Sequence, residues 1–432
     1  MHIVIVGNGI AGITCALDAR SRDASARITV VGGESEFFYS RTALMYAFMD
    51  KMNRRDLEPY ERDVWRKRNI GLVTDWVVDH DAEKREVKLA GGKTLTYDVL
   101  VLALGATANV PDWAGLAETK QGVVNFISAQ DLDACEALVP KAGRAVVVGG
   151  GLIGIELVEC LMHHGIATTF LIREPYYWPA ALSREESQMV IAHLREQGVE
   201  VVVDESVERV ESTGGRFDAV VTKSGKRYAG DILGVCIGVR ANLERMKAWK
   251  SAPASRRGIV VDQRFRTNLP AVFACGDCCE IERPGRAPLI ETIWYSAKRH
   301  GALVARNVFG DDVAYEPPVF FNSSKFFHIE FTTVGEVEYA PAGTPTIFRH
   351  RSGKHVCQRI VHDGTRVIGF NMLGSRWDNE VLARWVEERR SPTWVLRHLA
   401  EAQHDVELGR MNLQAFDEVN IPLAKLGSPP HA

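Results

Sequence analysis

The chain has 432 residues, which is more than one ordinary hydrophobic core supports and predicts two or three domains. Apolar residues make up 46% and charged residues 25%, the proportions of a soluble globular protein. A net charge of -3 argues against a dedicated nucleic-acid-binding protein, because such a protein needs a large basic surface. We expect no membrane span, since no stretch of about 18 apolar residues is free of charged side chains.

The first residues are apolar, but neither a basic leader nor a cleavage site of small residues accompanies them. We therefore interpret them as a first buried strand and not as a signal peptide. The eight cysteines are scattered, which favours a reduced cytoplasm over a disulfide framework. Their one cluster is Cys275, Cys278 and Cys279, and no second cluster or set of spaced histidines accompanies it, so we expect no metal site.

Residues 1–15, MHIVIVGNGIAGITC, combine a β-branched run, a glycine-rich turn and the start of a helix pattern. Gly7 permits the tight turn, Gly9 lets the backbone approach a pyrophosphate, and Gly12 allows the helix to pack closely on the strand. Phosphates would then rest on the N–H groups and the positive dipole of the helix N-terminus. A second predicted strand, residues 26–34, ends in Glu34, an acid suited to ribose hydroxyls.

The same pattern recurs at residues 144–159, RAVVVGGGLIGIELVE, with Gly149, Gly151 and Gly154 at the fingerprint positions. The helix after it is predicted to run to about residue 164. The next strand ends in residues 169–174, TFLIRE, where an acid would bind the ribose hydroxyls of a second dinucleotide. Ile172 and Arg173 stand there instead.

A third segment, residues 267–278, is TNLPAVFACGDC, which closely resembles the T-x-x-x-x-V-[FY]-A-x-G-D motif of FAD-dependent pyridine nucleotide-disulfide oxidoreductases. This motif and the two glycine fingerprints together give a resemblance to that family over about residues 1–315. Within the family, the resemblance is greatest to the ferredoxin, rubredoxin and nitrite reductase flavoprotein branch. The resemblance implies that Gly276 and Asp277 bind FAD, with Asp277 on the ribityl chain. Residues 99–106 match the family's A-T-G turn around Gly105, and residues 38–44, FYSRTAL, place Arg41 near the flavin. Pairing of Arg41 with Glu34 or Asp50 is the structural alternative.

The order of the motifs implies an α/β protein with two Rossmann-like dinucleotide-binding domains, the second inserted in the first. We expect an FAD-binding domain at residues 1–115 and 240–315 and an NAD(P)H-binding domain at residues 116–239. From about residue 319 strand patterns dominate, and they resemble the family's small α/β C-terminal domain, here residues 316–432 with a helical tail. Trp385 and Trp394 in that tail are predicted to be core or interface anchors.

Several side chains are candidates for the chemistry that the resemblance implies, in which a flavin accepts a hydride and releases electrons singly. Residues 290–305 match the helix that the family points at the flavin, so Trp294 and Lys298 would lie near the ring, although a core Trp is the competing interpretation. Glu156 matches an acid beside the nicotinamide pocket, with a surface or capping role as the alternative. Lys325 and Phe326 would approach the flavin from the C-terminal domain. No cysteine lies between Glu34 and Asp63, so we expect no thiol chemistry.

The second dinucleotide is predicted to be NADPH, with NADH as the second choice, because the guanidinium of Arg173 suits a 2′-phosphate that a carboxylate would repel. Three residues weaken this prediction. Gly154 is commoner in NADH enzymes, Glu174 could neutralise the arginine, and Pro179 stands where the NADPH enzymes of the family have a second basic residue.

The function that we predict is electron transfer from NAD(P)H through FAD to a small acidic carrier such as ferredoxin or rubredoxin. Basic stretches at residues 51–69 and 240–257 are candidate contacts for that carrier, with solvated loops as the alternative. A flavoenzyme acting directly on a small molecule is the first alternative function. A redox-responsive interaction protein resembling apoptosis-inducing factor is the second. A cytoplasmic location is expected, without nucleic-acid or membrane partners. The sequence does not give the oligomeric state, and the resemblance to the family offers a homodimer as one state.

Overall fold

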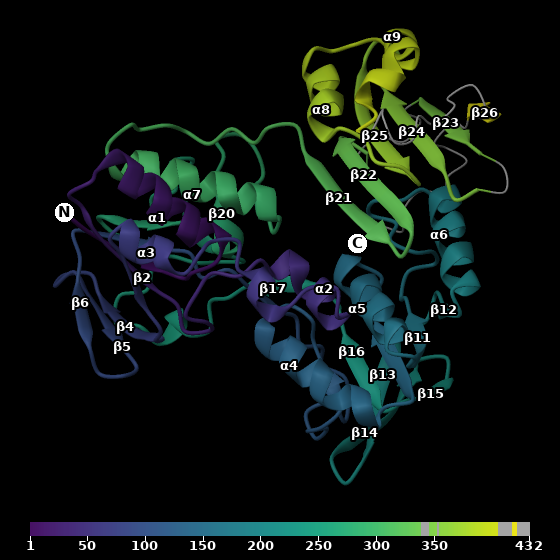
Figure 1. Cartoon of the computed structure of the whole chain (residues 1–432), viewed down its shortest axis with the longest axis horizontal. Helices are drawn as coiled ribbons and strands as arrows, with labels where there is room; N and C mark the ends of the chain where they lie inside the picture. The colour runs from purple at the N-terminus through teal and green to yellow at the C-terminus, as the bar shows by residue number, and fades with distance from the viewer. Residues whose placement is uncertain (338–344, 352–353, 405–416, 421–432) are drawn as a thin grey trace. The chain divides into compact units, whose positions relative to one another are not determined.

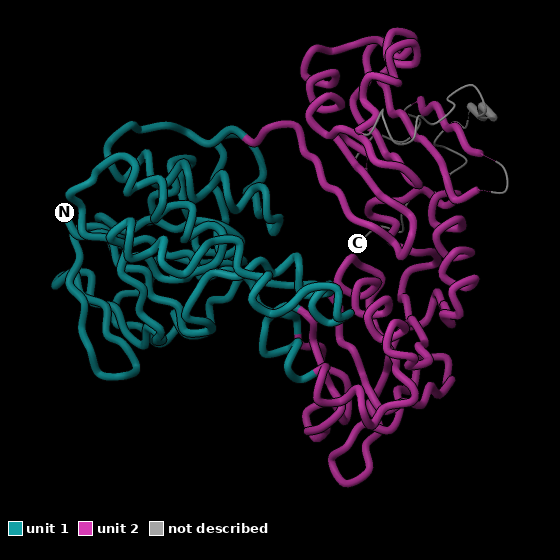
Figure 2. The backbone as a smooth tube through the Cα atoms, in the orientation of Figure 1, with its two compact units in different colours: residues 1–109, 127–134, 238–316 teal, residues 110–126, 135–237, 317–432 magenta. Residues whose placement is uncertain are grey.

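The computed structural model describes residues 1–337, 345–351, 354–404 and 417–420, and these form two compact units (Figure 2). Unit 1 comprises residues 1–109, 127–134 and 238–316, and unit 2 comprises residues 110–126, 135–237 and 317–432. Each unit is built from three separate stretches of the chain, because the chain leaves each unit and later returns to it. The insertion of one domain in another requires such an arrangement. Within the described residues no helix is long and apolar enough to cross a membrane. The division into three domains stays a prediction, and part of residues 316–432 lies outside the described residues.

Unit 1 is built on a parallel sheet in the order β19-β7-β1-β2-β3, whose central strand precedes the first glycine fingerprint. Its strands are rich in valine, isoleucine and leucine because a parallel sheet is covered on both faces. The helices α1 (Ile10–Arg22) and α7 (Trp294–Val308) lie side by side (Figure 1). Their backbones approach closely, since a β-carbon on Gly301 would lie 2.2 Å from the carbonyl oxygen of Ala11. The strands of the sheet are β1 (His2–Val6), β2 (Arg27–Val31), β3 (Ile70–Val73), β7 (Val99–Leu102) and β19 (Val272–Ala274).

Smaller elements complete unit 1. They comprise an antiparallel sheet, two strand pairs and two short α-helices. One further helix has its first residues in unit 1 and its last residues in unit 2. The sheet is β4 (Val77–Asp81), β5 (Glu86–Leu89) and β6 (Thr94–Thr96); the pairs are β8 (Ala106–Ala108) with β17 (Val239–Ala241) and β18 (Ile259–Val261) with β20 (Cys279–Ile281); the helices are α2 (Leu44–Phe48), α3 (Asp63–Lys67) and the crossing α4 (Ala129–Leu138).

Unit 2 repeats the parallel design in the order β12-β11-β10-β16-β9, again with the central strand leading into a glycine fingerprint. A three-stranded antiparallel sheet and the helices α5 (Leu152–His163) and α6 (Arg184–Glu196) accompany it. The prediction of two Rossmann-like folds is therefore confirmed. The strands are β9 (Val123–Val124), β10 (Arg144–Val148), β11 (Ala167–Leu171), β12 (Glu200–Val202) and β16 (Ile232–Val235), with β13 (Val207–Thr213), β14 (Arg216–Thr222) and β15 (Arg227–Ala229) in the antiparallel sheet.

The strand-rich C-terminal region of unit 2 forms one antiparallel sheet in the order β21-β22-β25-β24-β23-β26. Two helices with side-chain caps, α8 (Asn379–Glu387) and α9 (Pro392–His398), lie between β25 and β26 in the chain. Trp385 is 2% exposed and packs in the core of this region, while Trp394 contacts it edge-on and stacks on His398. The strands are β21 (Phe321–Phe326), β22 (Ile329–Gly335), β23 (Thr346–His350), β24 (Cys357–His362), β25 (Val367–Leu373) and β26 (Asp417–Asn420).

A fully buried ion pair joins α6 to this C-terminal sheet. Arg359 on β24 donates from Nε to Oε1 of Glu186 at 3.0 Å and from Nη2 to the carbonyl oxygen of Ala181 at 3.0 Å. Asn371 on β25 donates to the second oxygen of Glu186 at 2.9 Å, which satisfies the remaining acceptor. Glu186 also closes a capping box with Ser183 at the start of α6. Because buried charges are tolerated only when paired and hydrogen-bonded, this network fixes the position of α6 on the sheet.

The helix predicted at residues 290–305 begins four residues later, at Trp294. Ile293 has extended backbone angles, φ -122° and ψ 137°, and the side chain of Glu291 accepts hydrogen bonds from Ser296 and Tyr315. Glu291 thus holds the preceding segment outside the helix.

Candidate functional site

The two glycine fingerprints have the same backbone geometry in the two units. Gly7 and Gly149 have φ values of +112° and +118°, and a β-carbon on either would lie about 2 Å from a carbonyl oxygen: 2.0 Å from Ala103 and 2.1 Å from Cys236. The third glycines are equally restricted. A β-carbon on Gly12 would lie 2.0 Å from the oxygen of Gly7, and one on Gly154 would lie 2.1 Å from the oxygen of Gly149.

The middle glycines are free of such restrictions, since among the described residues, the two chain neighbours aside, no atom lies within 4 Å of a β-carbon placed on Gly9 or Gly151. The packing of the protein therefore does not explain why these two positions lack a side chain. A ligand that must approach the backbone closely does explain it, as a pyrophosphate does in this turn.

The helices that follow the fingerprints begin without side-chain caps. Gly9 and Gly151 are the N-cap residues of α1 and α5, neither helix has a side-chain cap bond, and neither carries an acid in its first turn. By contrast, Ser183, Asp378 and Ser391 cap α6, α8 and α9 with side-chain oxygens. The open N–H groups and the helix dipole favour an anion at the start of α1 and of α5. These residues fit the diphosphate of one dinucleotide in each unit.

Glu34, the expected ribose acid of unit 1, is already engaged in a small network after β2. Tyr39 donates its hydroxyl hydrogen to Glu34, and Arg41 donates to both carboxylate oxygens and to the carbonyl oxygen of Ile127 at 2.9 Å. Burial raises the pKa of Glu34, but the hydrogen bonds from Arg41 and Tyr39 outweigh it and hold that pKa below its ordinary value. Of the two roles considered for Arg41, the structure contains the pairing with Glu34. Sequence reasoning missed Tyr39, although it lies in the same short segment.

Gly276 and Asp277 form a tight turn at the start of a 3-10 segment, Gly276–Cys278. Gly276 has a φ of +79°, and its missing side chain makes room for the methyl group of Ala11 on α1. Burial raises the pKa of Asp277 to about 6, and the positive charge of Arg41 opposes this shift. Gly105 has a φ of +67°, and a β-carbon placed on it would have no protein atom within 4 Å.

Helix α7 also begins without a side-chain cap and without an acid in its first turn. The indole Nε1 of Trp294, its first residue, is buried and has no hydrogen-bond partner among the described residues. Lys298 is exposed, and its Nζ lies 5.4 Å from the centre of the Trp294 ring. A donor N–H left open beside a positive helix end suits an electron-rich ligand group.

Glu156 lies on the first half of α5, and a second acid, Glu159, follows one turn later. Lys325 on β21 donates from Nζ to Glu159, so the C-terminal sheet supplies a positive charge to this face of α5. Burial and the nearby negative charge of Glu159 raise the pKa of Glu156 to about 7, against the opposing effect of Lys325. Phe326 is fully buried and packs edge-on against Tyr177 at 5.7 Å between ring centres. Sequence reasoning missed Glu159, which its spacing of three from Glu156 could have revealed.

Arg173 follows β11 directly and has a side chain that is 77% exposed. Its guanidinium pairs with Glu174 at 2.8 Å. Ile172 is fully buried against the fingerprint, since its Cγ2 would lie 2.9 Å from a β-carbon on Gly150. The apolar residue is therefore part of the turn, while the arginine is directed to solvent beside it.

All eight cysteines lie in the described residues, are buried and form no disulfide. Burial, with a smaller effect of Asp18, raises the pKa of Cys15 on α1 to about 12, and burial raises that of Cys275 well above its usual range. Cys278 is hydrogen-bonded to the carbonyl oxygens of Leu102 and Cys275. A thiol must be accessible to exchange with a disulfide, so these buried cysteines are unsuited to that chemistry.

The contrast between Gly9 and Gly12 gives a direct test of the FAD diphosphate site expected at the start of α1. Gly9→Ala should fold normally, because its backbone is extended and its β-carbon meets no protein atom, but its affinity for FAD should fall at least about tenfold. Gly12→Ala should unfold at a lower temperature even without FAD. The measurements are flavin content per chain and the thermal unfolding of both apoproteins. Equal flavin affinity of Gly9→Ala and the unmodified protein would contradict the assignment.

The chain is similar to several flavoproteins. It is 29% identical to the ferredoxin–NAD(+) reductase subunit of the benzene 1,2-dioxygenase system of Pseudomonas putida, over 72% of this chain and 75% of that one. The solved structure of an NAD-dependent persulfide reductase from A. fulgidus superimposes with a TM-score of 0.81 at 26% identity, covering 95% of this chain and 80% of that one. An engineered water-forming NADPH oxidase, made from the NADH oxidase of Lactobacillus brevis, has a TM-score of 0.80 at 19% identity, with 95% and 94% covered.

The family comparison agrees with the geometry of both cradles. The sequence pattern of the pyridine nucleotide-disulphide oxidoreductases matches residues 1–301, which include both glycine fingerprints and the Gly276–Asp277 turn. The chain therefore belongs to the pyridine nucleotide-disulphide oxidoreductase family and is an FAD-dependent NAD(P)H oxidoreductase.

Proposed function

We propose that this enzyme takes a hydride from a reduced nicotinamide nucleotide and passes the electrons singly to a small electron-carrier protein. The observation that carries the proposal has two parts. Two glycine turns lead into helix N-termini without side-chain caps, at the starts of α1 and α5, and all the cysteines are buried. Without an accessible thiol, the flavin is the last redox group before the acceptor. The similarity to a ferredoxin–NAD(+) reductase subunit supports a carrier protein as that acceptor.

FAD, when bound, accepts two electrons as a hydride and can release them one at a time. In unit 1, the N–H groups at the start of α1 would hold its diphosphate, and Glu34, kept ionised by Arg41 and Tyr39, would accept from ribose hydroxyls. Asp277 would bind the ribityl chain. The uncapped end of α7 would stabilise negative charge on the reduced ring, with the open N–H of Trp294 beside it.

In unit 2, the start of α5 would hold the diphosphate of the nicotinamide nucleotide. Glu156 would accept a hydrogen bond from the nicotinamide carboxamide and so orient the ring that donates the hydride. Lys325 pairs with Glu159, and its positive charge there favours the ionised form of Glu156. Lys325 is thus proposed as a positioning residue.

The carrier would be small and acidic, as positive charge on the enzyme would then steer it. The stretch at residues 51–69 contributes less free charge than its sequence suggests, because many of its cations are paired. The pairs are Arg54 with Asp133, Arg55 with Glu58 and Glu61, Arg62 with Glu58, and Lys67 with Asp63. In the other stretch Lys247, Lys250 and Arg256 are paired with Glu244, Asp81 and Glu280. The docking surface, the cytoplasmic location and a homodimer stay predictions.

Stopped-flow absorption tests the proposed function. NADH or NADPH should bleach the flavin of the anaerobic enzyme, and ferredoxin or rubredoxin should then reoxidise it in one-electron steps. A thiol-alkylated sample should behave identically, because no cysteine takes part. Failure of both nucleotides to bleach the flavin would refute the proposal, and so would reoxidation that depends on a free thiol.

We propose NADPH as the preferred electron donor because Arg173 is exposed beside the second fingerprint and no acid occupies position 172. The engineered NADPH oxidase supports this choice. In that enzyme an aspartate was changed to alanine, and the next residue, an alanine, was changed to arginine. The aspartate lies 18 positions after a glycine that was also changed to alanine. Ile172 and Arg173 have that spacing from Gly154. Gly154 and Pro179 are the residue types that the NADH-dependent oxidase has at the same spacing before it was engineered. Arg173 would therefore be the main source of selectivity for NADPH over NADH.

Replacing the arginine should therefore affect the two nucleotides differently. Arg173→Ala should raise the KM for NADPH about tenfold or more, because hydrogen bonds to a charged group contribute about 1.5–3 kcal/mol, and should leave the KM for NADH nearly unchanged. Glu174→Gln should lower the KM for NADPH by releasing the guanidinium. Steady-state kinetics with both nucleotides measures this, and Arg209→Ala, an exposed arginine of the same unit, is the control. Equal changes with both nucleotides would count against NADPH.

The raised pKa of Glu156 predicts a pH dependence near neutrality. Only the ionised form is a pure acceptor, so the rate of flavin reduction should rise as pH increases through about 7. The transition should disappear in Glu156→Gln and move to higher pH in Lys325→Met, since removing the lysine removes the charge that favours ionisation. Stopped-flow reduction rates between pH 5.5 and 8.5, as a range of about three units around that pKa, would show it. A transition that persists in Glu156→Gln would assign it to another group.

A further inference from the structure

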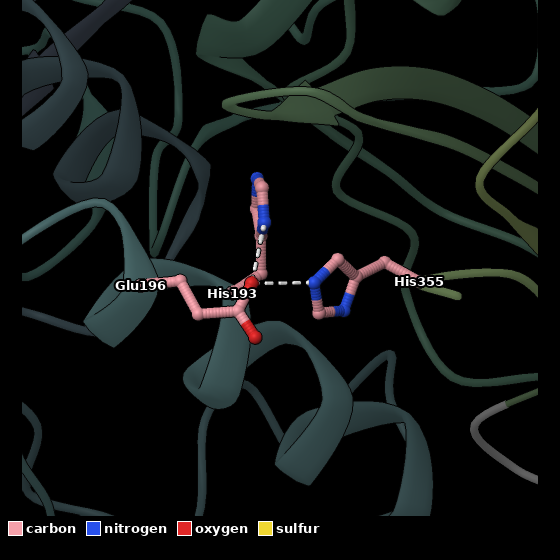
Figure 3. A group of neighbouring side chains, drawn as sticks. All are labelled: His193, Glu196 and His355. Carbon is pink, nitrogen blue, oxygen red and sulfur yellow. Dashed lines mark hydrogen bonds and ion pairs between the residues drawn. The ribbon is translucent and has the colours of Figure 1, made fainter. Parts of the chain in front are cut away.

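A cluster of histidines and an acid lies outside both dinucleotide cradles, where α6 meets the C-terminal sheet of unit 2. His193 and Glu196 are on the last turn of α6, and His355 is on the loop between β23 and β24. Their side chains point toward one another (Figure 3). Nε2 of His355 lies 2.7 Å from Oε2 of Glu196, and Nδ1 of His193 lies 3.7 Å from the same oxygen. One ligand atom of each residue lies within 4.8 Å of the other two.

His193 is the unusual member, because its side chain is only 7% exposed. Neither of its ring nitrogens has a hydrogen-bond partner among the described residues. Buried polar groups in folded proteins are almost always hydrogen-bonded, so a buried imidazole whose nitrogens make no hydrogen bond, with a carboxylate oxygen 3.7 Å from Nδ1, needs an explanation. Its neighbours are imidazoles and a carboxylate, which are groups that share metal ions.

A fourth candidate ligand lies nearby on a third element. His328 is in the turn between β21 and β22, and its ring centre lies 5.6 Å from that of His193. His355 is closer, at 4.6 Å between ring centres. Three imidazoles and one carboxylate therefore converge from one helix and two loops.

We propose that His193, Glu196 and His355 bind a Zn²⁺ ion, with His328 or a water molecule as the fourth ligand. Zinc binds imidazole nitrogen and carboxylate oxygen at about 2.0–2.2 Å in a tetrahedral arrangement, which separates ligand atoms by about 3.4 Å. The observed 2.7 and 3.7 Å lie on either side of that value, so small rotations of exposed side chains reach it. Mg²⁺ and Ca²⁺ prefer oxygen ligands and should bind poorly here.

The ion would fix the end of α6 opposite to the buried Glu186–Arg359 pair. That pair holds the first turn of the helix on the C-terminal sheet, and the zinc ligands belong to its last turn. A bound ion would thus attach both ends of α6 to the same sheet. Because zinc would bind the assembled site of the folded state more tightly than the unfolded chain, it should raise the unfolding temperature further as its free concentration increases above the Kd. This inference does not depend on the proposed electron acceptor.

Zinc titration of the tag-free, full-length flavoenzyme, freed of metal with EDTA, tests the proposal. Calorimetry should show one equivalent of Zn²⁺ that Mg²⁺ does not mimic. The affinity should fall at least about tenfold in His355→Ala and in Glu196→Gln, whose side chains are partly exposed and whose loss should not prevent folding. His163→Ala, which removes an exposed histidine of the same unit, should bind zinc normally.

Two further measurements make the result independent of folding defects and of other weak zinc sites. Co²⁺ in place of zinc should give absorption bands of a tetrahedral ion at wavelengths longer than those of the flavin, and both variants should lose them. Zinc should raise the unfolding temperature of the unmodified protein and of His163→Ala, and not that of the two ligand variants. No zinc binding in the unmodified protein, or the same binding in His355→Ala and Glu196→Gln, would overturn the proposal.

Discussion

The close approach of backbone to backbone in the two glycine fingerprints is the constraint on which the rest of the structure depends. In each unit the first glycine leaves room for a neighbouring carbonyl, and the third lets the helix lie on the turn itself. This packing brings the helix N-terminus to the end of the central strand, and the middle glycine leaves that N-terminus open. An anion-binding cradle results in each unit, because unpaired N–H groups and the helix dipole point to the same place.

Long-range charge pairs then decide what surrounds each cradle. In unit 1, Arg41 and Tyr39 keep Glu34 ionised, so the acid after β2 remains an acceptor despite its burial. In unit 2, Lys325 reaches from the C-terminal sheet to Glu159 on the helix of the fingerprint. The buried pair of Glu186 and Arg359 holds the same sheet on α6. The C-terminal region is therefore part of the nucleotide-binding unit in energetic terms, since breaking a buried ion pair is costly.

Much of the fold and part of the site were predictable from the sequence. The parallel sheets, both fingerprints, the strands of the C-terminal region and the anchoring role of Trp385 follow from local patterns of apolar residues and glycines. The antiparallel pairing of the C-terminal strands was not predicted. The start of α7 was predicted four residues too early, because the side chain of Glu291 competes with helix formation through contacts that no local pattern contains. The pairing of Arg41 with Glu34 was one of the alternatives that the sequence offered, because the two residues are only seven positions apart. The pairing of Lys325 with Glu159 depended on segments brought together by folding.

The sequence by itself determined where the backbone must turn tightly and where phosphates can approach, because glycine conformations and helix starts depend on a few adjacent residues. Tertiary structure alone decided which charges far apart in the sequence meet. Lys325 and Glu159 are 166 positions apart, and His355 and Glu196 are 159 positions apart. Such pairs have no local signature, since their distance is set by the packing of whole sheets and helices. The open nitrogens of His193 became visible only once that packing had removed it from water.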